Sequence, residues 1–314
     1  GELYLEYHRG TYTSMGRNKR ANRKCELMLH DIETLYALLM QDGVDYPQEQ
    51  INAMWENVLL NQFHDILPGS SIKEVYDVTL KEYNELQRQG GELIQKALNI
   101  IKERVGCETD SVIAVNTLGK KRNDLIEFES DNTVESLKDP IENKAYPVQK
   151  VSSNKYLAYV EDVPSKGYKA YALSADKIPG NTGMVVTEKR MENKFFDIVF
   201  NEKGNIQSIY DKVNKRNVLK PGQAGNVLQV FEDRPRSDEN WNIEIYYPQK
   251  MYEIDDVKSV EVIEEGPVRG GVRIVWKFFD STVTQNIYIY ENIPRIDFDC
   301  VIDWKEQRLL LKTA

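Results

Sequence analysis

Cysteine and histidine are both scarce in this sequence of 314 residues, which contains three of each. Cys25, Cys107 and Cys300 lie far apart, and their odd number argues against a disulfide framework. Free thiols are typical of a reducing compartment, so the sequence predicts a cytoplasmic protein. The histidines show no HExxH or HxH pattern and no cysteine partner, so spacing alone indicates no metal site.

Long apolar runs and a surplus of positive charge are also missing. The longest apolar run is only a few residues, so we expect no segment that spans a membrane. Residues 1–10 have neither the basic start nor the apolar core of a signal peptide. The net charge of −9 argues against a nucleic-acid partner, which requires a basic face, and is compatible with a neutral sugar.

The first third of the sequence contains helical patterns. A helix is expected over 18–41, where apolar residues recur at spacings of three and four and so share one face: Cys25, Met28, Ile32, Leu35 and Leu39. A second helix is expected over 47–67, between two prolines, and a third over 71–106. Three helices with short connections predict an antiparallel bundle.

Three local signals accompany these helices. Ser71 and Glu74 have the spacing of a capping box, which predicts the start of the third helix. Gly90 and Gly91 predict a weak point within it. Residues 1–14 are aromatic and rich in β-forming residues, and they predict a strand and a turn.

After Gly106 the apolar residues alternate, as in strands. Short strands are expected over 112–116, 125–128, 156–160 and 168–173. A linker is expected over 175–183. Longer strands are expected after it, over 195–200, 206–210, 227–231, 257–263, 270–279, 283–290 and 295–304. Residues 201–204, Asn-Glu-Lys-Gly, are typical of a hairpin turn. Regular strands without helices favour an antiparallel sandwich.

These patterns predict an α+β, multidomain protein. A three-helix bundle is expected over 18–106, a small β domain over 107–178 and a large antiparallel β-sandwich over 179–314. The strand pattern is still running at Leu309–Lys312. A sandwich that stopped there would have an unpaired edge, so we expect a natural polypeptide that continues.

Among the histidines, His64 has the most suggestive surroundings. It lies in the segment NQFHDILPGSS at 61–71, where a Pro-Gly break follows a polar triplet at the expected helix end. Asp65 is its neighbour, and nearby amide side chains can orient both through hydrogen bonds. The alternative is an ordinary polar helix end. His30, on the first helix, is interpreted as a surface or packing residue, and His8 as a loop residue.

A second candidate site lies between two expected strands. Asp233 belongs to an acidic cluster over 231–235, and Trp241 follows in the segment 238–242. Carboxylates beside a tryptophan suit carbohydrate binding, because the ring stacks on a sugar face and the acids accept hydrogen bonds from hydroxyls. The alternative is a solvated loop.

Two of these segments resemble the second half of glycoside hydrolase family 38, the α-mannosidases, in its bacterial, cytosolic form. They are YLEYHRGTYTS at 4–14 and NQFHDILPGSS at 61–71, of which the second is the more specific. Weaker matches follow in the same order along essentially the whole chain, at 163–168, 201–212, 231–235 and 302–304.

The resemblance implies that residues 1–17 are the end of a catalytic α/β barrel. In the family, an HxD pair and an aspartate of that barrel bind zinc together with one histidine of the helical region, which His64 matches. Asp65 matches the adjacent aspartate, which contacts sugar hydroxyls. His8 falls where relatives often carry an aromatic residue that lines the substrate pocket, and it is predicted to bind substrate. No residue here matches the HxD pair, the nucleophile or the general acid.

The implied function is that of a retaining, zinc-dependent α-mannosidase that hydrolyses terminal α-mannosides. The expected partner is a mannoside or oligosaccharide, without nucleic acid or membrane, and a homo-oligomer is compatible with the chain. This chain would supply one zinc ligand and substrate contacts, and alone it is expected to be inactive. One alternative is a non-catalytic carbohydrate-binding module that binds through the β-sandwich and its Trp241 loop. Another is a purely structural fragment.

Overall fold

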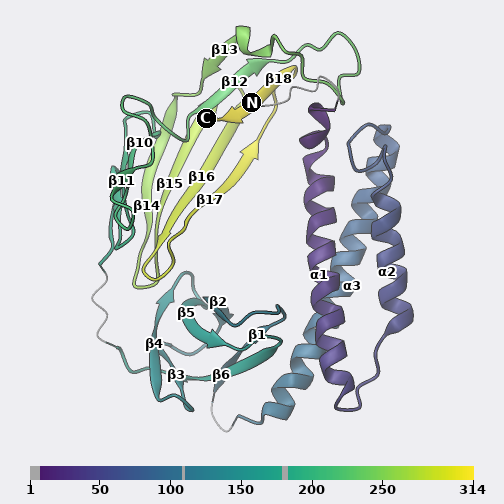
Figure 1. Ribbon diagram of the computed structural model, residues 1–314, viewed down its shortest axis with the longest axis vertical. Coiled ribbons are helices and arrows are strands. Elements are labelled where there is room, and N and C mark those ends of the chain that lie inside the picture. Colours follow the sequence, from purple (N-terminus) through teal and green to yellow (C-terminus); the bar gives the residue numbers. More distant parts are fainter. Residues whose placement is uncertain (1–7, 108–109, 179–182) are drawn as a thin grey trace.

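The computed structural model describes residues 8–107, 110–178 and 183–314. Helices form one side of the molecule, a small β unit lies near one end of them, and a larger group of sheets stands opposite the helices (Figure 1). This arrangement confirms the predicted α+β fold, a helical bundle followed by antiparallel β units. Within the described ranges, no helix is long and apolar enough to cross a membrane.

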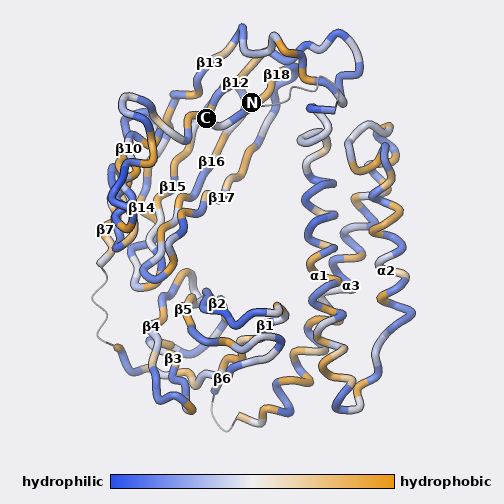
Figure 2. Tube along the Cα trace, in the orientation of Figure 1, coloured by the Kyte–Doolittle hydropathy of each residue, from blue (hydrophilic) through white to orange (hydrophobic). Residues whose placement is uncertain are grey.

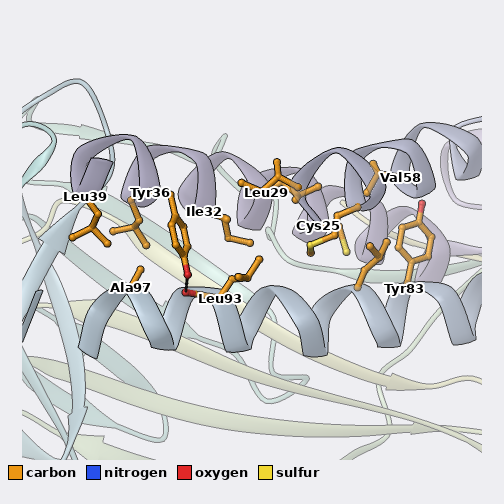
Figure 3. Close-up of a cluster of buried hydrophobic side chains, with 13 residues drawn as sticks. Cys25, Leu29, Ile32, Tyr36, Leu39, Val58, Tyr83, Leu93 and Ala97 are labelled. Carbon is orange, nitrogen blue, oxygen red and sulfur yellow. Dashed lines mark hydrogen bonds between the residues drawn. The ribbon is translucent and has the colours of Figure 1, made fainter. Parts of the chain in front are cut away.

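The bundle consists of α1 (Gly16–Met40), α2 (Gln48–Asn61) and α3 (Lys73–Val105). Their apolar faces meet in one buried cluster, to which α1 and α3 contribute most of the side chains. Figure 3 shows how these side chains interdigitate, and how the Tyr36 hydroxyl donates a hydrogen bond of 3.3 Å to the carbonyl oxygen of Leu93. The helical periodicity of the sequence therefore marks the face of α1 that is buried.

The end of α2 differs from the prediction. The helix stops at Asn61, whereas its apolar pattern continues through Ile66 and Leu67. Residues 62–72 form turns instead. The carbonyl oxygens of Ile66 and Leu67 accept hydrogen bonds from side chains of the other helices, so these two residues are held by tertiary contacts instead of a further helical turn.

Of two other local predictions at this end of the bundle, one is wrong and the second is only partly covered by the described residues. The Ser71 hydroxyl donates a hydrogen bond of 2.6 Å to the carbonyl oxygen of Asp65, so it does not cap α3. Ile72 occupies the N-cap position, without a side-chain cap. The strand expected over 1–14 lies partly outside the described residues, and of the remainder Gly10–Tyr12 form a short 3-10 helix.

The small β unit has six strands among the described residues, in the sheet order β1-β6-β3-β4-β5-β2. The strands expected from alternation are present, whereas β3 and β4 were not predicted, because β4 carries Pro147 within its pattern and β3 is short. The bounds are β1 (Ser111–Asn116), β2 (Arg122–Glu129), β3 (Ser136–Asp139), β4 (Lys144–Lys150), β5 (Lys155–Val163) and β6 (Gly167–Ser174).

The larger β unit packs its sheets around one apolar core. Sheets β11-β10-β9-β8-β7 and β13-β12-β18 contribute to the same cluster as the long hairpins of sheet β14-β15-β16-β17. The bounds are β7 (Val185–Thr187), β8 (Arg190–Glu192), β9 (Phe196–Phe200), β10 (Ile206–Asp211), β11 (Arg216–Asn217), β12 (Leu228–Glu232), β13 (Met251–Glu253), β14 (Val257–Glu265), β15 (Arg269–Phe278), β16 (Ser281–Tyr290), β17 (Ile296–Asp303) and β18 (Leu309–Thr313). The turn predicted at 201–204 is confirmed and joins β9 to β10.

Hydrogen bonds join the three units to one another. Thr117 donates to the carboxylate of Asp31 over 2.7 Å, which ties the small β unit to α1. The buried amide of Gln149 donates to Glu264 over 2.8 Å, which ties the same unit to the β14–β15 hairpin. At the other end of the bundle, the loop after β12 contacts the residues before α1, which ties the larger β unit to the helices (Figure 1).

The predicted weak point of the third helix does not interrupt α3, which continues through Gly90 and Gly91. Gly90 is buried against α1, where a Cβ atom would lie 2.3 Å from the Met28 sulfur. Gly91 is exposed, and a Cβ atom there would meet nothing within 4 Å. The first glycine therefore permits close helix packing, whereas the second only adds flexibility.

These two glycines make a matched test of the packing. We expect Gly91→Ala to raise the free energy of unfolding by about 0.5–1 kcal/mol, because alanine loses less conformational entropy in a helix. We expect Gly90→Val to lower it by about 1–3 kcal/mol, because its methyl groups overpack the contact with Met28. Urea unfolding of both variants measures the difference, and equal shifts would show that α1 does not pack closely at Gly90.

Candidate functional site

The loop between α2 and α3, residues 62–72, carries His64 and Asp65. His64 lies in a turn beyond the end of α2, and 77% of its side chain is exposed. Its ring contacts that of Phe63, with centroids 4.1 Å apart, and its Nε2 lies 3.6 Å from Oδ2 of Asp65. The imidazole is therefore open to solvent and able to receive a partner from outside the chain.

Asp65 is held more firmly than His64. Its Oδ1 accepts a hydrogen bond of 3.1 Å from the Ser70 hydroxyl, and its carbonyl oxygen accepts bonds from Ser71 and from Tyr76. The other carboxylate oxygen, Oδ2, faces the imidazole. One oxygen of Asp65 thus fixes the side chain while the other remains beside His64.

Side chains of the neighbouring helices hold the rest of the loop. The Tyr76 hydroxyl on α3 also donates to the carbonyl oxygen of Ile66 over 3.2 Å. The carbonyl oxygens of Leu67 and Pro68 accept hydrogen bonds from Lys19 on α1, at 2.8 and 3.0 Å. Four consecutive carbonyl groups are therefore bound by side chains, which fixes the loop without any strand or helix of its own.

His8 and Trp241, far apart in the sequence, lie next to each other. Their ring centroids are 4.8 Å apart and the rings are tilted by 53°. They line a cavity of about 220 Å³ together with Asp238 and Asn242. An indole and an imidazole with neighbouring carboxylate and amide groups form a surface that can receive a sugar face and its hydroxyls.

Asp233 lies just beyond β12. Its backbone N–H donates to the carbonyl oxygen of Arg308 over 2.9 Å, and it is not among the residues that line the His8–Trp241 cavity. Its Oδ1 is buried and has no hydrogen-bond partner among the described residues. Burial raises the pKa of this carboxyl group. The structure therefore does not bring Asp233 together with Trp241.

The segment just before α1 brings the two groups to one end of the bundle. The backbone N–H of Gly10 donates to the carbonyl oxygen of Trp241 over 2.8 Å, and the Ser14 hydroxyl donates to the carbonyl oxygen of Asn240 over 2.9 Å. On its other side Ser14 touches the His64 loop, where a Cβ atom on Gly69 would lie 2.7 Å from the Ser14 side chain. The candidate residues from three parts of the sequence thus share one region.

A second cavity beside this region was not predicted. It measures about 420 Å³ and lies between the starts of α1 and α3, with Gly69 of the His64 loop and Asn240 at its rim. Tyr76 lines it and also binds the loop, which places this tyrosine among the residues that shape the site. The periodic position of Tyr76 on α3 predicts that its side chain is buried. Its hydrogen bond to Ile66, ten residues earlier, corresponds to no sequence pattern that would predict it.

The donor chemistry of the His64 loop suits one zinc ligand. Imidazole nitrogen and carboxylate oxygen are both common zinc ligands, and structural or catalytic sites need three or four protein donors. Within the described ranges, no three histidine, cysteine, aspartate or glutamate side chains gather to hold a metal ion. His64 therefore fits as one contributor to a shared site, and the described residues do not form a complete site by themselves.

Two family models match the sequence. The Alpha mannosidase middle domain matches residues 6–101, and the Glycosyl hydrolases family 38 C-terminal domain matches residues 191–314. The first match contains the His64 loop, and the second contains the Trp241 loop.

Curated relatives match nearly the whole chain. Alpha-mannosidase G of Dictyostelium discoideum is 29% identical over 99% of this chain, and Alpha-mannosidase 2C1 of Homo sapiens is 28% identical over 99%. The chain spans only 32% and 29% of their lengths. An alpha-mannosidase crystal structure from Enterococcus faecalis V583 has the same fold, with a TM-score of 0.77 at 17% identity, covering 97% of this chain and 43% of that one.

The hydrogen bonds of Tyr76 yield a test of how the loop is held. We expect Tyr76→Phe to lower the free energy of unfolding by about 1–3 kcal/mol, because it removes a donor to the carbonyl groups of Asp65 and Ile66 and leaves the part-buried N–H of Ser71 without its acceptor. Tyr168→Phe, at an exposed position on β6, should have little effect. Thermal unfolding of both variants measures this, and matching melting temperatures would contradict the assigned role of the Tyr76 hydroxyl.

Proposed function

Because this chain is the middle and C-terminal portion of a family 38 glycosyl hydrolase, we propose that the intact protein hydrolyses terminal α-mannosides. The observation that carries the proposal is the match of both family models in their expected order, with relatives named α-mannosidases along 99% of the chain. The free cysteines support our proposal of a cytoplasmic protein.

We propose that His64 provides one ligand of a zinc ion in the intact enzyme. Its exposed imidazole lies on a loop that side chains hold in place, and Asp65 lies beside it with one oxygen already bound by Ser70. When bound, zinc would orient hydroxyl groups of the mannose and act as a Lewis acid. Asp65 would accept hydrogen bonds from the same sugar, and a charged acceptor strengthens such bonds.

We further propose a retaining mechanism, in which one carboxylate attacks the sugar and a second carboxyl group protonates the leaving oxygen, the two about 5–5.5 Å apart. Both groups would come from the catalytic barrel that the family resemblance implies. Within this chain, His8 and Trp241 would contact the sugar rings at the edge of that site, as their cavity allows.

The same cavity is the observation in favour of the second candidate, a carbohydrate-binding module without catalysis. Such a module would bind mannosides through Trp241 whether or not His64 is intact. A mannosidase would lose turnover when either the zinc ligand or the substrate contacts are removed. Mannoside binding and turnover, both measured on the intact protein with and without His64, distinguish the two candidates.

Substitutions in the intact enzyme test the roles of His64 and Asp65. We expect His64→Ala to lower zinc affinity and kcat by more than the 10–100-fold typical of an outer-sphere residue, with little change in melting, because an exposed ring leaves no cavity. We expect Asp65→Asn to retain zinc but lose kcat, because the charged contact strengthens in the transition state.

The matched control is His30→Ala, which removes an imidazole from the exposed face of α1 and should change neither quantity. Metal analysis, melting curves and rates on an aryl α-mannoside measure all three variants. A helix-end role predicts the opposite for His64→Ala, a loss of about 1 kcal/mol in stability with zinc and kcat unchanged. Full zinc occupancy in that variant would rule out the ligand role.

We also expect the 314-residue chain alone to be inactive on an aryl α-mannoside and to bind zinc weakly, since it has no match to the nucleophile, the general acid or the HxD pair. Calorimetric titration with zinc and a rate assay on the purified chain measure this. Tight, stoichiometric zinc that is lost on His64→Ala would show that the remaining ligands are within this chain.

A further inference from the structure

Lys19 is the residue of α1 that joins the His64 loop to the segment before the helix. Its Nζ donates hydrogen bonds to the carbonyl oxygens of Ser14, Leu67 and Pro68, at 2.5, 2.8 and 3.0 Å. A lysine ammonium group has three N–H donors, so all of them are used. One side chain thus connects both segments that carry the candidate residues.

Charge pairing does not explain this placement. In the part of the chain that the structure describes, no carboxylate forms an ion pair with Lys19. The first turn of α1 contains no acidic residue, and the positive end of the helix dipole disfavours a cation there. Burial lowers the pKa of Lys19. The ammonium group therefore sits in an unfavourable field, and the three carbonyl dipoles offset that cost.

The bonds of Lys19 complete the support of the loop. Tyr76 and Ser71 hold it from the α3 side at Asp65, and Lys19 holds it from the α1 side two residues further on. Gly69, with φ of +99°, packs closely against Ser14, just before α1. The Gln62 amide at the start of the loop also donates to Asn22 and Glu26 of α1, at 3.2 and 2.8 Å. Without Lys19, α1 would therefore still hold the loop at Gln62 but would lose its bonds to Leu67 and Pro68.

We propose that Lys19 is a positioning residue for His64 and Asp65, fixing the loop so that both side chains are presented in one geometry. The role in zinc and sugar binding rests on the proposed mannosidase function, whereas the clamp on the loop does not. A purely structural lysine would stabilise the whole bundle evenly. A positioning lysine affects the loop 62–71 and the ligands that His64 and Asp65 bind.

The clamp is tested in this chain by Lys19→Met, which retains an unbranched side chain one atom shorter and removes the three donors. We expect amide hydrogen exchange within 62–71 to accelerate by about 10–100-fold, since hydrogen bonds to a charged group are lost, while exchange in the middle of α1 is unchanged. Lys24→Met, at an exposed position on the same helix, is the matched control and should exchange like the wild type.

Lys19→Arg separates charge from geometry, because it retains the charge while its planar fork cannot reach three carbonyl groups arranged around one point. We expect intermediate exchange in the loop. If Lys19→Met does not fold, hydrogen exchange in Lys19→Arg still tests the clamp. Loop exchange equal to wild type in the folded variants, or acceleration spread evenly over the bundle, would overturn the clamp.

The consequence for function is measured in the intact enzyme. We expect Lys19→Met to weaken zinc binding and lower kcat by about tenfold or more, as for a residue that orients a ligand, when both are measured well below the melting temperature of the variant. Unchanged zinc affinity and kcat beside a loosened loop would overturn the positioning role. If the wild-type enzyme bound no zinc and turned over no mannoside, the proposed function would fail, and the exchange experiment would still decide the clamp.

Discussion

The close approach of two backbone segments is the constraint on which the candidate site depends. Gly10 lies so near the loop after β12 that a Cβ atom at this position would be 3.0 Å from the carbonyl oxygen of Asn240. A side chain at this position would push the two segments apart by a few tenths of an ångström, and so disturb the hydrogen bond from Gly10 to Trp241 and the ring contact of Trp241 with His8. The β units thus reach the bundle end at the place where the His64 loop also lies.

The sequence predicted elements where one periodicity continues for several turns or strands. The face of α1 that carries Cys25 and Leu39 and the long strands β15 and β16 followed their patterns closely. Short strands such as β3 and β13 were missed, because a few residues do not establish alternation. The division into domains stays a prediction, although the sheets change between β6 and β7, where the linker was expected.

The candidate site was less accessible to sequence reasoning. Apolar residues beyond Asn61 suggested more helix, whereas the loop is shaped by hydrogen bonds from Lys19 and Tyr76, which are remote or on another helix. Such bonds have no local spacing to recognise. The resemblance to family 38 identified His64 and Asp65 where residue spacing alone did not, and the geometry adds which side chains hold them.

The contact between the β units and the start of the bundle also has a consequence for how the molecule folds. The Ser14–Asn240 bond joins residues 226 positions apart in the sequence, so forming it closes a loop that contains the bundle, the small β unit and the first strands of the larger β unit. Contacts of such high sequence separation gain their free energy only after the entropy of closing the loop has been lost. We therefore expect the contact between the Trp241 loop and residues 8–14 to form after the local contacts of the helices and the sheet hairpins. Slow folding of a β unit would thus delay the appearance of the site.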